Sequence, residues 1–195
     1  MIVITTTTSA AEFPGRAEVR ALYRAAEEGP PLNEPPSTAA LFAALHQGAV
    51  QRERVVASIA RDHGRLVSFS YGHPWRWVEQ QDPWADELRG RLAEDASRLD
   101  GSFALNLLAR APGERYRGLG RTVLVEWLRA IQGASCWLQT SDLDSPAQRL
   151  YVALGFSAIG HGPPAPNGAP GLVLFRPATG SDARRPIGSE RGDPG

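Results

Sequence analysis

The chain has 195 residues, of which 42% are hydrophobic, and it carries 21 basic and 21 acidic side chains. This length is enough for one domain with its own core. The zero formal net charge excludes a long-range attraction to nucleic acid or to an anionic membrane, so any basic site has to be local.

The single cysteine and the N-terminal stretch indicate the cellular compartment in which the protein is expected. Cys136 lies in the apolar run "ASCWLQT" and has no second cysteine to pair with, so we expect a buried structural thiol in a reducing compartment. The stretch "MIVITTTTSA" lacks the basic and long apolar parts of a signal peptide, and no run approaches the roughly 20 apolar residues of a membrane span. We therefore expect a soluble, cytoplasmic protein without membrane contact.

The chain begins with a predicted strand and two predicted helices. Residues 1–7 are largely β-branched, which favours a strand. Residues 14–29 predict a helix, because apolar side chains recur at helical spacing at Val19, Leu22, Tyr23 and Ala26. Residues 37–48 predict a second helix that is capped by Ser37 and ended by Gly48, with an apolar face made of Leu41, Phe42 and Leu45.

A hairpin and an irregular insertion follow. Residues 54–60 and 65–72 read as strands on either side of the turn "RDHG", so antiparallel pairing is expected. The segment from His73 to Asp100 carries three tryptophans and then leucines at 88, 92 and 99, which indicate an amphipathic helix. We interpret this segment as an insertion between strands.

The second half alternates strands and helices. Residues 102–112 form a nearly continuous apolar run, typical of a buried strand. The helix that follows has a buried stripe made of Leu124, Trp127, Leu128 and Ile131. We then predict a strand at 135–141, a helix at 145–155 and strands at 156–160 and 171–176. Residues 179–195 contain no aromatic side chain and predict a disordered tail, so the folded domain is expected over residues 1–178.

The loop "RYRGLGR" combines glycines and arginines at the beginning of a helix. A helix N-terminus presents unpaired backbone N–H groups and the positive end of the helix dipole, and glycine lets a bulky anion approach them. Arg115, Arg117 and Arg121 add positive charge around Gly118 and Gly120. The pattern predicts a phosphate site; the alternative is a glycine-rich turn with solvated arginines.

This order of elements resembles the GNAT superfamily of acyl-CoA-dependent N-acyltransferases, and two motifs carry the resemblance. Arg115, Gly118 and Gly120 stand where the pyrophosphate-loop motif of that family has its arginine or glutamine and its glycines. The segment "DSPAQRLYVALGF" resembles the second signature of the family, with Asp144 in place of the usual asparagine. The resemblance implies an α/β (α+β) fold: a mixed, mostly antiparallel sheet of about seven strands with about four helices, and a Trp-rich insertion before the fourth strand.

The resemblance also implies where the cofactor binds. Acetyl-CoA would place its pyrophosphate over residues 115–121, which comprise Arg115, Tyr116, Arg117, Gly118, Leu119, Gly120 and Arg121. Its pantetheine would bind backbone left unpaired at Leu108, Ala109 and Arg110, where the strand ending in "NLLAR" diverges from the strand "SCWLQTS". A backbone N–H there would stabilise the oxyanion as the amine attacks the thioester.

The catalytic assignment rests on two residues. By resemblance, Tyr151 is the proton donor to the departing thiolate, although its position on an apolar stripe also fits packing. The strand over residues 103–110 has no acid that could act as base, since Ala104, Asn106 and Leu107 stand there. His73 is the best substitute because histidine titrates near neutrality, and a loop histidine is the alternative. Asp144 is explained as a helix cap.

Trp75 and Trp77 either line a pocket for the acceptor or bury the insertion against the domain. The resemblance therefore implies an N-acetyltransferase that transfers the acetyl group of acetyl-CoA to a primary amine of a small molecule by direct attack in a ternary complex. The alternative is a catalytically silent acyl-CoA-binding module. No metal and no nucleic-acid partner are expected, and the oligomeric state stays open, a homodimer included.

Overall fold

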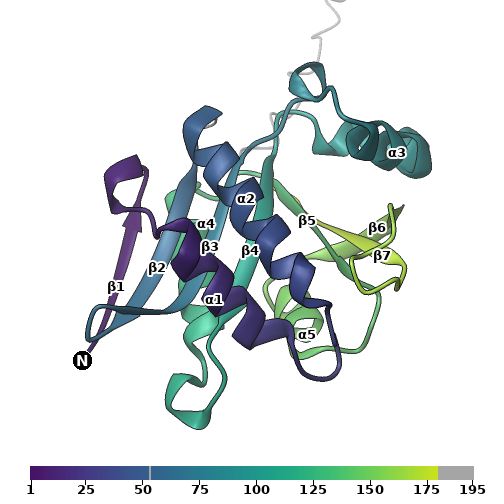
Figure 1. The fold of residues 1–195 in the computed structure, drawn as a ribbon. Helices are drawn as coiled ribbons and strands as arrows, with labels where there is room; N and C mark the ends of the chain where they lie inside the picture. Colours follow the sequence, from purple (N-terminus) through teal and green to yellow (C-terminus); the bar gives the residue numbers. More distant parts are fainter. Residues whose placement is uncertain (53, 180–195) are drawn as a thin grey trace, which may run out of the picture.

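The structure is a computed structural model, and it describes residues 1–52 and 54–179. The predicted disordered tail over residues 179–195 therefore lies outside the described residues, apart from Thr179, whose backbone N–H donates to the carbonyl oxygen of Gly133 at 2.8 Å. In the described part of the chain, one mixed sheet of seven strands is flanked by five α-helices (Figure 1). This confirms the predicted fold class, with one helix more than expected.

The sheet has the strand order β1-β2-β3-β4-β5-β7-β6. Its members are β1 (Ile2–Thr7), β2 (Val56–Asp62), β3 (Arg65–Pro74), β4 (Phe103–Arg110), β5 (Cys136–Ser141), β6 (Ser157–Gly162) and β7 (Gly171–Arg176). All neighbours pair antiparallel except β4 and β5, which are parallel. The predicted hairpin is present, because His63 and Gly64 join β2 to β3 with φ of 48° and 82°, as a tight two-residue turn requires.

The helices cover both faces of the sheet. They are α1 (Arg16–Glu27), α2 (Pro36–Arg52), α3 (Pro83–Leu92), α4 (Leu119–Ala130) and α5 (Pro146–Ala153). Helices α1 and α2 lie on one face of the β1–β4 half, and α4 lies on the other (Figure 1). Ser70 on β3 faces α4, since its hydroxyl donates to the carbonyl oxygen of Val123 at 3.1 Å. Among residues 1–52 and 54–179, no helix combines the length and apolarity that crossing a membrane requires.

Helix α2 differs from its prediction in its bounds. It begins at Pro36, so Ser37 lies inside the helix rather than at its cap, and it continues past Gly48 to Arg52. A glycine in a helix interior costs about 1 kcal/mol relative to alanine. The burial of Ala49 beyond it, which leaves that residue 7% exposed, favours continuation of the helix.

The buried face of α2 also differs from the prediction. Leu41 and Leu45 are each half exposed, whereas Ala39, Ala43 and His46 face the sheet and are nearly inaccessible to solvent. Small side chains let the helix approach the sheet closely, and this packing outweighs the burial of the leucines.

The tryptophan-containing segment lies before β4, as predicted. It consists of the 3-10 helix η2 (Trp77–Glu79), helix α3 and the 3-10 helix η3 (Ala93–Leu99). Leu88, Leu92 and Leu99 are buried, which confirms the amphipathic pattern. These side chains join Trp75 and Trp137 in one apolar cluster against β4, β5 and β7.

Candidate active site

The parallel strands β4 and β5 separate soon after they meet. They pair only at Phe103 with Cys136 and at Ala104 with Trp137. Beyond this point β4 continues beside β3, and β5 continues beside β7. The sheet therefore has a V-shaped opening between β4 and β5, as the resemblance to the GNAT superfamily implied.

One edge of β4 faces this opening. The N–H of Ala111 donates to the carbonyl oxygen of Val67 on the β3 side at 2.8 Å. Backbone groups of successive strand residues point to opposite edges. By this alternation the N–H and C=O of Arg110 and Leu108 point into the opening, while those of Ala109 point to β3. Two of the three expected backbone positions thus offer hydrogen-bonding groups at the open edge.

The glycine-containing loop ends at the first turn of α4. Gly118 is the N-cap residue and adopts a left-handed conformation with φ of 84°. The N–H of Thr122 donates to the Gly118 carbonyl at 3.0 Å, so the N–H groups of Leu119, Gly120 and Arg121 precede the first bond of the helix. Within the described residues no side chain caps this end. The turn has the properties of an anion site.

The arginines around this turn have different partners. Arg115 forms an ion pair with Asp62, with 2.6 Å between Nη2 and Oδ2. Arg117 pairs with the exposed Glu114 at 3.4 Å. Arg121 is exposed at the first turn of α4, and none of the ion pairs among residues 1–52 and 54–179 involves it. Arg121 is therefore the arginine whose charge is available to an anion at this helix end.

Two further residues shape the loop. The guanidinium of Arg110 donates to the carbonyl oxygens of Ala111 and Gly113 at 2.8 and 3.2 Å, which fixes the chain as it leaves β4. Tyr116, in the 3-10 helix η4 (Glu114–Tyr116), donates its hydroxyl to Asp62 Oδ2 at 3.3 Å. The loop is thus held by side chains on its own strand and on β2.

Tyr151 lies in the middle of α5, which begins after the cap residue Ser145. The Ser145 hydroxyl accepts the N–H of Gln148 at 3.1 Å, so Ser145 and not Asp144 caps this helix. The ring of Tyr151 is buried and contacts Phe156 edge-on. Burial, and secondarily the charge of Glu27, raises the pKa of its hydroxyl. Tyr151 therefore stays protonated at neutral pH, and its hydroxyl is a weaker acid than an ordinary phenol.

His73 lies where β4 and β5 are still paired. Its partner on β4 is Ala104, the last residue of β4 that pairs with β5. The side chain is 7% exposed, and its Nδ1 is 2.9 Å from the carbonyl oxygen of Pro74. This places His73 one strand away from the beginning of the opening.

Trp75 and Trp77 pack together in the insertion. Trp75 contacts Trp77 and Trp137 edge-on, with ring centroids 5.3 and 4.9 Å apart. The indole N–H of Trp77 donates to the carbonyl oxygen of Ala96 at 2.8 Å, and Arg89 lies over its ring. These contacts pack α3 and η3 against the sheet, and a role of the two rings in an acceptor pocket stays a prediction.

The two strands that border the opening each carry an amide residue shortly after they separate. Asn106 and Gln139 each follow the last paired residues, Ala104 and Trp137, by two positions. Residues two apart share a face of a strand. Asn106 is also the extra residue of a β-bulge, since Leu105 and Leu107 pair with consecutive residues of β3. Asn106 Oδ1 and Gln139 Oε1 are buried without a hydrogen-bond partner in the described residues. The Gln139 amide donates its N–H to the Pro163 carbonyl oxygen at 2.9 Å and lies against Gly162 and Gly171, on the β7 side of β5.

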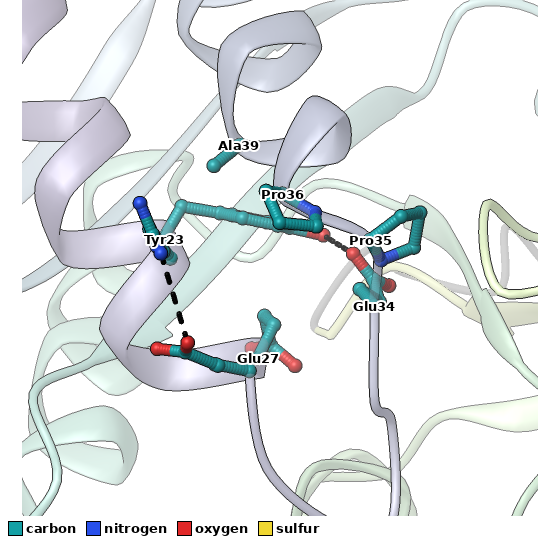
Figure 2. Close-up of a pocket in the computed structure, with 8 residues that line it drawn as sticks. Tyr23, Glu27, Glu34, Pro35, Pro36 and Ala39 are labelled. Atoms are coloured by element: carbon teal, nitrogen blue, oxygen red, sulfur yellow. Dashed lines mark hydrogen bonds and ion pairs between the residues drawn. The ribbon is translucent and has the colours of Figure 1, made fainter.

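Glu27 is a residue that the sequence did not single out. It is the last residue of α1, within the charged run "AAEEG", and looks there like a solvated helix end. In the structure, its Oε2 is buried and has no hydrogen-bond partner among the described residues. It lines a small depression with Tyr23 and Glu34 (Figure 2).

Comparisons with known proteins point to one fold. No family model matches the sequence, and no curated protein matches it. Among solved structures, an aminoglycoside 6'-acetyltransferase type Ii has a TM-score of 0.60 and 18% identity, over 92% of this chain and 99% of that one. The ribosomal-protein-S18-alanine N-acetyltransferase from Escherichia coli has a TM-score of 0.58 and 17% identity, over 95% and 99%.

A third structure bears on the cofactor. An acetyltransferase from Salmonella typhimurium, determined with its cofactor acetyl-CoA, has a TM-score of 0.54 and 12% identity, over 95% of this chain and 99% of that one. Such matches extend over nearly the whole length of each neighbour. A further match, from Desulfovibrio desulfuricans, is described as belonging to the GNAT family and has a TM-score of 0.58 and 17% identity, over 90% of this chain and 96% of that one. The chain therefore has the GNAT fold.

Proposed function

We propose that the protein is an acetyl-CoA-dependent N-acetyltransferase that acts on a primary amine of a small molecule. One observation carries the proposal: a single short loop joins the unpaired edge of β4 to the first turn of α4, which no side chain of the described residues caps. A helix N-terminus binds phosphate oxygens, and an open strand edge binds an extended amide chain. Coenzyme A has a pyrophosphate and a diamide pantetheine arm in that order.

The residues present fit this cofactor. A Cβ atom placed at Gly118 would meet no atom within 4 Å, and one at Gly120 would meet only Arg110 Cβ at 3.9 Å, so the space in front of the turn is open. The N–H groups of Leu119, Gly120 and Arg121 would hold the pyrophosphate, with the Arg121 side chain adding charge. The edge groups of Leu108 and Arg110 would hold the pantetheine.

Bound acetyl-CoA supplies a thioester whose carbonyl carbon is open to attack by an amine nitrogen. The backbone of β4 at the opening orients that carbonyl through its free N–H groups. Tyr151 holds a proton that its hydroxyl can donate toward the departing sulfur. Its raised pKa makes it a weaker acid than an ordinary phenol, so its contribution is expected to be modest.

The acceptor is proposed only as a chemical class, a primary amine of a small molecule. The two neighbours named for their substrates are named for an aminoglycoside and for the alanine of a ribosomal protein. Asn106, on the strand that borders the opening, has a side-chain oxygen without a hydrogen-bond partner among the described residues, and an amide oxygen of this kind accepts hydrogen bonds from amines. We also propose a cytoplasmic site of action, because Cys136 is a free, buried thiol whose pKa is raised to about 12 by burial and which does not need an oxidising compartment.

The absence of an acid on β4 favours one alternative, a silent module that binds acyl-CoA without turning it over. A panel of amines that includes aminoglycosides, polyamines and peptides beginning with alanine separates the two. We expect thiol release from acetyl-CoA with at least one of these amines, and a product heavier by one acetyl group in mass spectrometry. Tight acetyl-CoA binding without thiol release for any amine would support the silent module instead.

A further inference from the structure

The end of α1 is a partly enclosed acidic site. Glu27 lines the depression in Figure 2 together with Tyr23, Glu34 and Pro35. The Tyr23 hydroxyl donates to Glu34 Oε2 at 2.7 Å, so Glu34 already has a donor. Glu27 is partly exposed as a residue, but its Oε2 is inaccessible and has no donor among the described residues. The hydrogen-bonding capacity of this carboxylate oxygen is therefore unused within the described part of the chain.

This end of α1 lies beside the candidate active site. The segment that joins α1 to α2 reaches the far half of the sheet, because the amide of Asn167, between β6 and β7, donates to the carbonyl oxygen of Leu32 at 3.0 Å. Asn167 in turn accepts the hydroxyl of Ser141, at the end of β5, at 3.2 Å. The segment thus crosses the opening between β4 and β5. The charge of Glu27 also acts on Tyr151 of α5.

The environment of Glu27 changes its acidity. Burial, with a further contribution from the charge of Glu34, raises the pKa of Glu27 to about 7. The titratable groups that face it are Glu34 from the linking segment, Tyr23 from its own helix and Tyr151 from α5. Arg24 and Glu28 also line the depression, and they pair with each other at 3.8 Å. A carboxyl group with such a pKa exchanges protons readily at neutral pH.

We propose that Glu27 is the general base of the reaction, the group that β4 lacks. The inference rests on the proposed acetyltransferase function. The acceptor arrives as an ammonium ion and must lose a proton before its nitrogen can attack. Glu27, at the end of α1 beside Tyr151 and with an unpaired carboxylate oxygen, takes that proton.

The proposed reaction transfers the acetyl group from the sulfur of acetyl-CoA to the amine nitrogen. The ammonium nitrogen gives one proton to the Glu27 carboxylate, which passes it to water. The freed electron pair forms the N–C bond to the acetyl carbonyl carbon, and the C–S bond breaks with its electrons remaining on sulfur. The nitrogen then loses a second proton to water, and the sulfur gains a proton from water or from Tyr151, which water then reprotonates. The products are an N-acetyl amide and a thiol.

A pH profile with matched variants tests the proposal. Glu27→Gln removes the base and keeps the shape, while Glu28→Gln changes the neighbouring glutamate of the same helix. With an amine substrate, the wild type is expected to lose kcat/KM below an apparent pKa near 7. Glu27→Gln should lose about 10²- to 10⁴-fold at pH 7.5 and lack this acid limb. Glu28→Gln should match the wild type.

Two measurements that do not depend on turnover accompany the profile. Calorimetry should give acetyl-CoA affinities within twofold of wild type for both variants, because Glu27 is assigned to the amine. The melting temperature of Glu27→Gln should exceed that of wild type at pH 8, because a buried charge is removed, and the gain should shrink toward pH 5. Glu28→Gln should show no such pH-dependent gain.

These measurements distinguish a failure of the Glu27 assignment from a failure of the proposed acetyltransferase function. Unchanged kcat/KM and an intact acid limb in Glu27→Gln would overturn the assignment, as would loss of the limb in His73→Gln but not in Glu27→Gln. An equal loss in Glu27→Gln and Glu28→Gln would also overturn it. If the wild type binds acetyl-CoA but releases no thiol with any amine, the proposed function itself fails, and the inference fails with it.

Discussion

Asp62, the last residue of β2, connects three parts of the molecule. Its side chain is 5% exposed and receives the guanidinium of Arg115, the hydroxyl of Tyr116 and, at 3.3 Å, the amine of Met1. Burial alone would raise the pKa of Asp62, but the amine and Arg115 outweigh it and hold the pKa below its usual range. Because Arg115 and Tyr116 belong to η4, directly before Gly118, Asp62 positions the loop that we assign to the pyrophosphate.

Asp62→Asn is therefore expected to weaken acetyl-CoA binding without unfolding the protein. The amide keeps the shape but loses the charge-assisted bonds to η4. We expect the Kd to rise about 3- to 30-fold, since only part of the effect of the lost bonds acts on the loop. Calorimetry measures this, with Glu114→Gln as the control because its ion pair is exposed. Equal affinities for the two variants would refute the positioning role.

Tyr151 allows a separate test of the proton donor. Tyr151→Phe keeps the ring and its contact with Phe156 and removes the hydroxyl alone. A thiol has a pKa of about 8 to 9, below the raised pKa of the Tyr151 hydroxyl, so proton donation is energetically uphill and the expected loss in kcat is on the order of 10- to 1,000-fold. Acetyl-CoA affinity and melting temperature should stay near the wild-type values. Full turnover in a folded variant would mean that Tyr151 is a packing residue and that water protonates the thiolate.

At the scale of single elements, the loop and α5 could be predicted because their signals are local. A left-handed glycine before a helix, or a Ser-Pro pair at its beginning, determines the backbone whatever packs on it. The face of α2 could not be predicted in this way. Leu41 and Leu45 satisfy the helical period as well as Ala39 and Ala43 do, and the choice depends on the distance between α2 and the sheet.

The role proposed for Glu27 could not be predicted from local signals either, because it also depends on tertiary packing. In the sequence it is one of two adjacent glutamates at a helix end. Its burial comes from the segment leading to α2 and from α5, which is far away in the chain. The motifs thus predicted the proposed cofactor site, whereas residues that would meet the acceptor depend on tertiary contacts.

The face of α2 leads to a stability prediction. Leu41→Gln and Leu45→Gln should each change the free energy of unfolding by no more than about 0.5 kcal/mol, because both positions are half exposed. Ala43→Leu should destabilise by about 1–3 kcal/mol, because a larger side chain at this fully buried position would be overpacked. Urea denaturation measures all three. A large loss for the leucine variants would mean that α2 buries its leucine face.

At the scale of the whole molecule, a buried histidine ties stability to pH. His46 of α2 is surrounded by the rings of Phe13, Phe69 and Tyr71. Neither ring nitrogen has a hydrogen-bond partner among the described residues. Burial lowers the pKa of His46 to about 4. The folded protein therefore holds His46 neutral at a pH where the unfolded chain would already bind a proton.

The direction in which His46 changes stability with pH depends on which state, folded or unfolded, binds more protons. Between the unfolded pKa near 6.5 and the folded value, the unfolded state binds more protons, so stability falls as the pH falls. Comparing urea denaturation of the wild type and His46→Leu at pH 7.5 and pH 5 isolates this contribution. The wild type should lose about 2 kcal/mol more than the variant over this interval. Equal losses would show that His46 is protonated in the folded state.

The central claim is that the first turn of α4 and the open edge of β4 bind acetyl-CoA. Its most direct test is calorimetric titration of acetyl-CoA into wild type, Gly120→Val and Gly90→Val. Gly120 has no positive φ and free space at its Cβ position, so valine there should disturb the ligand more than the fold. Gly90, in α3, is an exposed helix glycine with equal space and serves as the control. We expect one bound acetyl-CoA in wild type and in Gly90→Val, and at least tenfold weaker binding in Gly120→Val. Absence of binding to the wild type, or equal affinity in all three proteins, would contradict the claim.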